Sequence, residues 1–296
     1  NDTRANANII SILQGYSDPR LERWFATNNA DIYSTDDELS PVVEKATKYL
    51  GVRQGVPMTR TEYQGYSKTS RVGIPEQGPR PVLRVAEAYF LRAEGMLRNW
   101  NMGDGTPESL YNEGIHSAWA SVLGDESGWA GTYESYINGF INTEEGGDFD
   151  WELFEGGFGS APYINYRNQE YNYYIEENGK QVGINRISVR WHDEDSPEKK
   201  LQRIITQKWI SFFPTLSSVA WTEYRRTGYP KLIPIPSDLN YSNGAIDTEL
   251  QIRRLPFTQS EYRGNTEEVN KALGLLKGPD NGGTRLWWDV DKGNFE

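Results

Sequence analysis

Residues 201–232, with the sequence LQRIITQKWISFFPTLSSVAWTEYRRTGYPKL, constrain the fold more than any other stretch of this chain. Apolar side chains from Ile204 to Trp209 recur at the spacing of one helix face. Pro214 stops this helix, because it has no N–H to donate and its ring clashes with the preceding turn. A second amphipathic run ends at Gly228, a typical helix C-cap. The polar side chains predicted to point away from the apolar face of the first helix are Arg203, Gln207 and Lys208.

Two helices joined by a tight turn form a hairpin, which must stack on other helices to bury its apolar face. A second hairpin is predicted at about 81–124, upstream of the one at 201–226. Its second helix has a typical start at Thr106 and Pro107 and ends at Gly124. The buried stripe of its first helix, over 81–100, is Leu83, Ala86, Phe90, Ala93 and Leu97. Helix, short loop and helix over about 40 residues is the tetratricopeptide-like unit, so we predict a mainly helical fold of stacked hairpins (an α-α superhelix) with little strand.

The two ends of the chain are less regular in sequence. Residues 1–30 are predicted to be a polar loop followed by a short helix, with Asp18 as its N-cap and Pro19 in its first turn. A helix is expected at 41–50. Towards the C-terminus the sequence predicts an extended IRRLPF segment, a helix after Asn265, and an extended TRLWWDV segment. Adjacent tryptophans in an extended segment point to opposite faces, so we expect at least one of this pair to be structural.

Composition excludes several classes of function. The net charge of −11 disfavours binding to nucleic acid or to anionic lipid. No stretch approaches the roughly 20 apolar residues of a membrane span. The absence of cysteine excludes disulfides and thiolate chemistry, and the two histidines, His116 and His192, are not at metal-ligand spacing. His116 is predicted to have an ordinary packing role beside Ile115 and Trp119, and no cofactor or metal is predicted.

Residues 125–200 differ from both hairpins, being rich in aromatic, glycine and acidic residues. A long loop inside a compact domain is usually functional or has structure of its own. Flat aromatic rings stack on the apolar faces of sugars, so this insert is a candidate ligand site, although each ring could instead fill a loop-rich core. The candidate ligand-binding residues are Trp129, Tyr133, Trp151, Phe154, Tyr163, Tyr166, Tyr173 and Tyr174.

An enzyme is the alternative from another class. Glycosidases use two carboxylates that flank a sugar, and the insert holds an acidic cluster within 144–155. The spatial separation that would identify such a pair is not visible in sequence, and no catalytic residue is predicted. Oxygen ligands for calcium are present, but without the spacing of an EF-hand loop. The acidic residues of the cluster are Glu144, Glu145, Asp148, Asp150, Glu152 and Glu155.

Several stretches of the sequence resemble the C-terminal portion of the SusD/RagB family of outer-membrane nutrient-binding lipoproteins. They occur in the family's order and cover most of the chain. These stretches are SDPRL, PVLRVAEAYFLRAEG, YNEGI, ITQKWISFF, AWTEYRRTGYP, IRRLPFTQSEYRGN and LWWD.

The resemblance implies a helical, tetratricopeptide-like scaffold whose long loops carry the ligand, and no enzymatic activity. It implies capture of a glycan at the surface of the outer membrane, with a SusC-like TonB-dependent transporter as partner. A peptide-binding, RagB-like role is the alternative. We expect residues 1–296 to be a single SusD-like domain, the C-terminal part of a longer architecture. In that architecture an N-terminal lipid anchor, which this chain does not contain, makes the only membrane contact.

Overall fold

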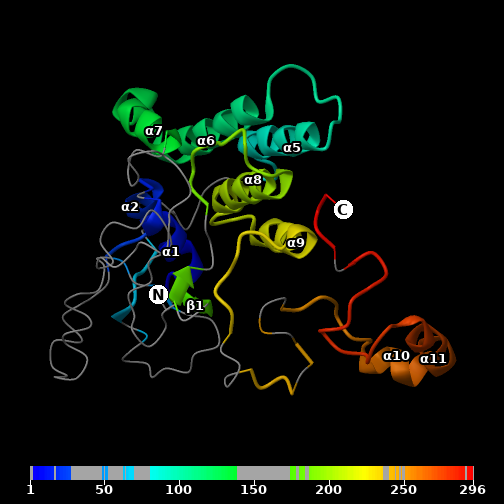
Figure 1. Ribbon diagram of the computed structural model, residues 1–296. Helices are drawn as coiled ribbons and strands as arrows, with labels where there is room; N and C mark the ends of the chain where they lie inside the picture. The colour runs from blue at the N-terminus through cyan, green and yellow to red at the C-terminus, as the bar shows by residue number, and fades with distance from the viewer. Residues whose placement is uncertain are drawn as a thin grey trace.

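The computed structural model is mainly helical (Figure 1). Its helices form a stacked group, with a smaller pair set apart near the C-terminus. The predicted mainly helical fold of tetratricopeptide-like hairpins is therefore confirmed. The residues that the structure describes are 3–16, 18–27, 49, 51–52, 63, 65–69, 81–138, 174–177, 180–183, 187–235, 240–243, 245–246, 248, 251–290 and 292–295.

Helices α5 (Val85–Leu97) and α6 (Pro107–Leu123) form the first hairpin. The Thr106 hydroxyl accepts a hydrogen bond from the Ser109 N–H at 3.0 Å, which caps α6 as predicted. The two helices approach closely at Gly114, because a Cβ there would lie 2.6 Å from Phe90 Cε1. Phe90 is completely buried at this contact, and burial of such a ring stabilises the fold by about 2–3 kcal/mol. A short 3-10 turn, η2 (Glu126–Gly128), then leads into α7 (Ala130–Ile137).

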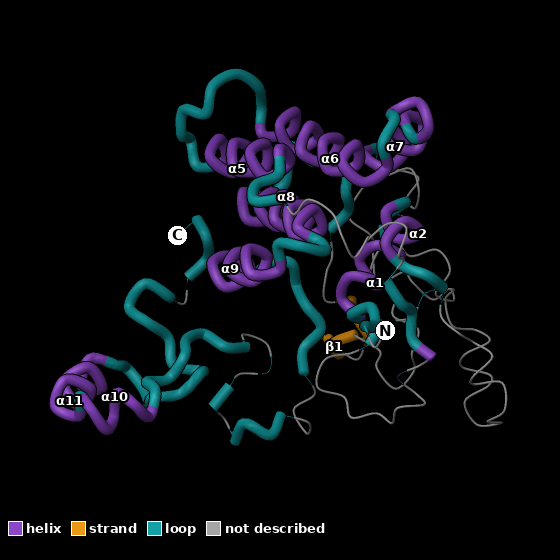
Figure 2. Tube along the Cα trace, turned by 180° about the vertical axis from the view of Figure 1, so that it is seen from behind, coloured by secondary structure: helices purple, strands orange, loops and turns teal. Residues whose placement is uncertain are grey.

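Helices α8 (Pro197–Phe212) and α9 (Ser217–Thr227) form the second hairpin, and α8 also packs on α5 (Figure 2). Gly228 ends α9 in the left-handed conformation, at φ 76°, as its position predicts. The polar side chains that were predicted to lie off the apolar face of α8 are nevertheless buried. Because α5 and α6 pack on one side of α8 and α9 on the other, it is covered almost all round. The polar side chains that are buried are Arg203, Gln207 and Lys208.

Among the described residues before these hairpins lie two short helices, α1 (Ala7–Gly15) and α2 (Arg20–Trp24). The predicted polar loop at the N-terminus is therefore wrong over α1. Isoleucine and leucine side chains of α1, such as Ile10, are buried in the main core, and this tertiary packing outweighs the many polar residues of the segment. The helix expected at 41–50 lies outside the described residues, apart from the single residue Tyr49.

A buried polar network joins α2 to α7 and α8. The Arg20 guanidinium donates to both carboxylate oxygens of Asp18, at 2.9 and 2.6 Å. The Tyr136 hydroxyl donates to Asp18 at 2.7 Å and accepts from the Gln207 amide at 2.9 Å. Burial lowers the pKa of Arg20, but the charge and hydrogen bonds of Asp18 outweigh burial and raise this pKa overall. Each buried charge is thus paired, as such groups must be.

A half-buried ion network links α5, α8 and α9. Arg226 donates to both carboxylate oxygens of Glu94 at 2.7 Å, and to Glu223 at the same distance. Lys208 adds a contact to Glu223 at 3.2 Å. Burial raises the pKa of Glu94, but hydrogen bonds from Arg226 and Arg98 outweigh burial and hold this pKa below its usual value.

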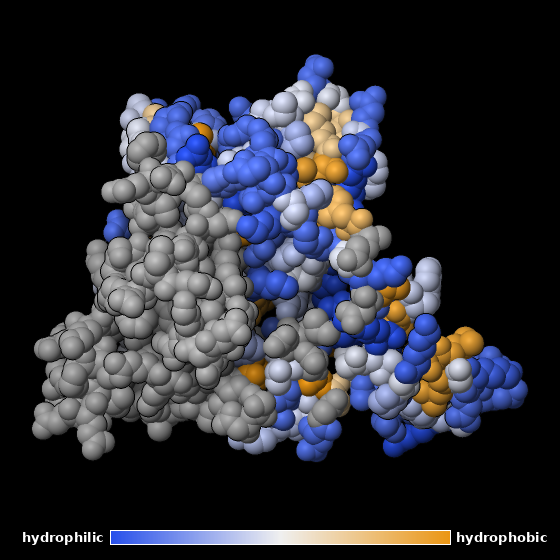
Figure 3. All heavy atoms as spheres, viewed as in Figure 1, coloured by the Kyte–Doolittle hydropathy of each residue, from blue (hydrophilic) through white to orange (hydrophobic). Residues whose placement is uncertain are grey.

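The remaining described elements are small. Strands β1 (Tyr174–Glu177) and β2 (Lys180–Gly183) form an antiparallel hairpin in which Ile175 pairs with Val182. Helices α10 (Gln259–Gly264) and α11 (Thr266–Leu275) form the separate pair near the C-terminus. Orange, apolar surface is visible on this pair in Figure 3. Among the described residues, no helix is both long and apolar enough to cross a lipid bilayer.

Candidate functional site

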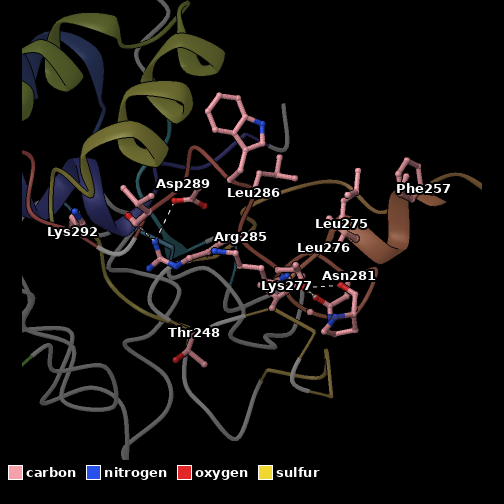
Figure 4. A pocket seen from close by; sticks show the side chains of 18 of the residues that line it. Thr248, Phe257, Leu275, Leu276, Lys277, Asn281, Arg285, Leu286, Asp289 and Lys292 are labelled. Atoms are coloured by element: carbon pink, nitrogen blue, oxygen red, sulfur yellow. Dashed lines mark hydrogen bonds and ion pairs between the residues drawn. The ribbon is translucent and has the colours of Figure 1, made fainter. Parts of the chain in front are cut away.

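A cavity of about 1160 Å³ lies in the C-terminal segment, between the end of α11 and the chain that follows it (Figure 4). Its apolar wall includes Phe257, Leu275 and Leu276. Its polar lining includes amide, hydroxyl and charged side chains. These polar residues are Asn240, Thr248, Lys277, Asn281, Thr284, Arg285, Asp289 and Lys292.

Backbone contacts between distant segments build one side of this cavity. The IRRLPF segment, predicted to be extended, forms neither helix nor strand, and the Arg253 N–H donates to the Gly282 carbonyl at 2.7 Å. A Cβ on Gly283 would lie 3.0 Å from the Ala245 carbonyl oxygen, and one on Gly282 would lie 3.2 Å from Ile246 Cγ1. The glycine pair therefore lets the loop around 245 approach the 279–284 loop closely.

Two aspartates fix the loops that surround the cavity. Asp289 accepts hydrogen bonds from Arg253 Nε at 2.6 Å and from Arg285 at 3.3 Å. Asp280 accepts from the Tyr262 hydroxyl at 2.6 Å and from the Arg254 guanidinium at 2.5 Å. Desolvation raises the pKa of Asp280, but the bonds from Tyr262 and Arg254 outweigh it and lower this pKa.

Trp287 and Trp288 lie in a turn beside this cavity, and Trp287 forms part of its lining. Their rings meet edge to face, with centroids 5.3 Å apart. Trp287 is 82% exposed and Trp288 58%, which is unusual for the largest side chain. The expectation that one of them is structural is wrong, because the segment is a turn rather than an extended strand and neither ring is directed into a core.

These features together suit recognition of an oligosaccharide. An exposed indole offers a flat apolar face, while neighbouring amide, hydroxyl and charged groups can hydrogen-bond sugar hydroxyls. Sequence reasoning noted the tryptophan pair but interpreted at least one of the two as structural, and it did not predict the cavity. The missed signal was the position of two tryptophans between the charged residues Arg285 and Asp289, which is atypical of a core segment.

The structure places two of the eight ring residues predicted as ligand contacts in the core. Trp129 is 6% exposed and Tyr133 8% exposed, and both pack edge to face against Trp119. His116 contacts the same two rings, which confirms its predicted packing role. Burial therefore gives Trp129 and Tyr133 a packing function here.

The structure does not describe the side chains of the other six predicted rings. For Tyr174, which begins β1, only the backbone is described. The rest of this group lies outside the described residues, as does the acidic cluster at 144–155. The rings concerned are Trp151, Phe154, Tyr163, Tyr166 and Tyr173. Within the part of the chain that the structure describes, no group of histidine and carboxylate side chains could hold a metal ion.

Known proteins share the sequence motifs and the fold of this chain. A family model described as SusD and RagB outer membrane lipoprotein matches residues 1–136 and 158–289. A chitin-binding SusD homologue from Flavobacterium johnsoniae is 35% identical with a TM-score of 0.70, over 99% of this chain and 50% of that protein. A SusD homologue from Bacteroides vulgatus is 33% identical with a TM-score of 0.68, over the same shares of the two chains.

A third solved structure, a SusD homologue from Bacteroides ovatus, is 31% identical with a TM-score of 0.69, over 97% of this chain and 52% of that one. The chain thus spans about half the length of these solved relatives. No significant match was found among curated proteins. The family match covers most of the chain, and the chain therefore belongs to the SusD/RagB family of outer membrane lipoproteins.

Proposed function

We propose that this protein captures an oligosaccharide at the outer membrane surface without altering it chemically, for import through a SusC-like TonB-dependent transporter. Family membership supports a role in nutrient capture, and one similar structure is that of a chitin-binding homologue. The transporter is proposed from the family resemblance. As the chain spans about half of its relatives' length, the proposal concerns the part of the binding surface that this half carries.

The observation that carries the proposal is the exposed Trp287 in the lining of a large cavity that combines an apolar wall with polar side chains. Water exposure of a whole indole face is costly unless the ring has a partner, because the hydrophobic effect favours its burial. A pyranose ring would cover that face, while Asn281 and Asn240 lie on the same cavity lining to bond its hydroxyls. The six predicted rings Trp151, Phe154, Tyr163, Tyr166, Tyr173 and Tyr174 are proposed as further ligand contacts.

Calorimetric titration with a chito-oligosaccharide tests this proposal. We expect saturable binding that Trp287→Ala weakens by about 1–3 kcal/mol, which is about 5- to 150-fold in Kd. Trp100→Ala is the matched control, because Trp100 is also exposed, at 62%, but lines a different and smaller cavity beside α5 and α9. Equal losses in the two variants would contradict a site at Trp287. A panel of unrelated peptides in the same assay tests the RagB-like alternative, which tighter binding of peptide than of sugar would favour.

The absence of catalysis needs its own assay. After long incubation with the protein, the oligosaccharide should be recovered at its original length by chromatography. Steady release of shorter sugars that is abolished by Glu152→Gln would instead support a glycosidase that uses the acidic cluster. An inactive control preparation made in parallel distinguishes this activity from a contaminating enzyme.

A further inference from the structure

The charge of the C-terminal cavity differs from that of the chain. The whole protein has a net charge of −11, yet three cationic side chains and one carboxylate are the charged groups of the described cavity lining. The cations are Lys277, Arg285 and Lys292, and the carboxylate is Asp289. Figure 4 shows Arg285 between the two lysines in that view, with Phe257 and Leu275 to one side. The cavity is thus a locally positive site on an acidic protein.

The described carboxylates near the cavity are already paired with arginines. Asp289 forms ion pairs with Arg253 and Arg285. Asp280 is bonded by Arg254 and by the Tyr262 hydroxyl. These carboxylates are 9% and 11% exposed, so arginines hold them away from solvent. Neither is therefore available to neutralise a lysine on the cavity wall.

Lys277 and Lys292 are the charged groups of the lining that remain available to pair with a ligand. Both are exposed, and neither forms an ion pair or hydrogen bond with another described residue. An ammonium on a flexible chain acts as a mobile point charge, which suits an anionic group whose position varies along a polymer. Trp287 lies on the same lining, so one ligand could stack on the indole and reach an ammonium.

We propose that this cavity selects an anionic oligosaccharide, whose rings stack on Trp287 and whose carboxylate or sulfate groups pair with Lys277 and Lys292. This inference rests on the proposed function and narrows its ligand class. Neutral sugars use only the stacking and hydrogen-bonding part of the site. The ammonium groups add affinity for a charged sugar, since the cavity holds no unpaired described carboxylate that would compete for them.

A matched pair of sugars isolates the charge. Oligogalacturonate and its fully methyl-esterified form have the same rings and linkage, but only the first is charged. We expect the acidic form to bind roughly tenfold more tightly at about 0.05 M salt, and the advantage to shrink at about 0.5 M salt as the charges are screened. A sulfated oligosaccharide compared with its desulfated form shows whether sulfate serves as well as carboxylate.

Lysine variants locate the effect. Lys277→Gln combined with Lys292→Gln should abolish the preference for the acidic sugar over its ester, so that the two forms bind with equal affinity. Lys271→Gln is the control, because Lys271 is an exposed lysine of α11 that already pairs with Glu267 and Glu268. It should leave the preference intact.

The outcomes separate the two proposals. If the charged and uncharged members of both sugar pairs bound equally tightly, and Trp287→Ala weakened the binding of each, the anionic selectivity would be overturned. The capture function would still stand. A preference that survives in the double lysine variant would also overturn this inference. Failure of all these sugars and of chito-oligosaccharide to bind would overturn the capture function and with it this inference.

Discussion

Arg253 and Asp289 form a two-pronged ion pair that ties the segment after Gln251 to the turn carrying the two exposed tryptophans. Their side chains are only 8% and 9% exposed. Arg253 also donates to the Arg225 carbonyl at 3.1 Å, so the same guanidinium reaches the last turn of α9. The orientation of Trp287 is thus linked to the helical scaffold through one buried arginine.

Asp289→Ala should loosen this turn. It leaves the Arg253 guanidinium buried without a carboxylate, and removal of one partner of a buried pair costs about 3–5 kcal/mol. We expect faster amide hydrogen exchange over residues 276–290 and weaker oligosaccharide binding, with the exchange of α5 and α6 unchanged. Lys271→Gln, which breaks only exposed ion pairs, should leave the exchange of this turn unchanged. Unchanged exchange in Asp289→Ala would show that the pair does not hold the turn.

The network beneath α2 predicts a larger effect on global stability. Asp18→Ala leaves Arg20 fully buried without its carboxylate and should lower the free energy of unfolding by about 3–5 kcal/mol, measured by urea denaturation. Tyr136→Phe retains the ring and removes one hydrogen bond to Asp18, so we expect a smaller loss of about 1–3 kcal/mol. If the two variants lost the same stability, the charge of Asp18 would not be the dominant contribution.

Stability should fall as the solution is acidified. The pKa of Glu94 is lower in the folded protein than its usual value of 4.5, so the folded state binds fewer protons than the unfolded state. The stabilisation from this carboxylate is therefore complete above about pH 4.5 and is lost as the pH falls through the lower folded-state pKa. Glu94→Gln should reduce the difference in unfolding free energy between about pH 7 and about pH 3. An unchanged pH dependence in that variant would contradict the role of the Arg226–Glu94 pair.

Trp151 and Trp129 should respond differently to truncation. Trp151→Ala is expected to weaken oligosaccharide binding by about 1–3 kcal/mol with little change in Tm, as for a binding anchor. Trp129→Ala removes a buried ring of the core and should cost about 3–5 kcal/mol of stability. Titration and thermal denaturation of both variants check this. A large drop in Tm for Trp151→Ala would make that ring part of the core instead.

The hairpins could be predicted from sequence because periodicity and capping are local signals. Thr106 and Gly228 mark helix ends through their own backbone and side-chain chemistry. The burial of Arg203 could not be foreseen, since it depends on α5, α6 and α9 packing around α8. Helix α1 was missed because the polar residues just before it, at 1–6, drew the prediction of a loop over an apolar run that packs in the main core.

The candidate site was predictable only in part. The tandem tryptophans stood out in the sequence, but their exposure depends on a turn fixed by the contact of Asp289 with Arg253, which is 36 residues away in the chain. The cavity beside them needs the loops around Ala245 and Gly283 to meet. No local pattern encodes such a contact between distant loops.

A crystal structure of the protein with chito-oligosaccharide at saturating concentration tests the central claim most directly. The account predicts a sugar ring lying face to face with the Trp287 indole, with neighbouring hydroxyls bonded to side chains of the cavity. Sugar bound only elsewhere, with Trp287 left bare, would contradict it.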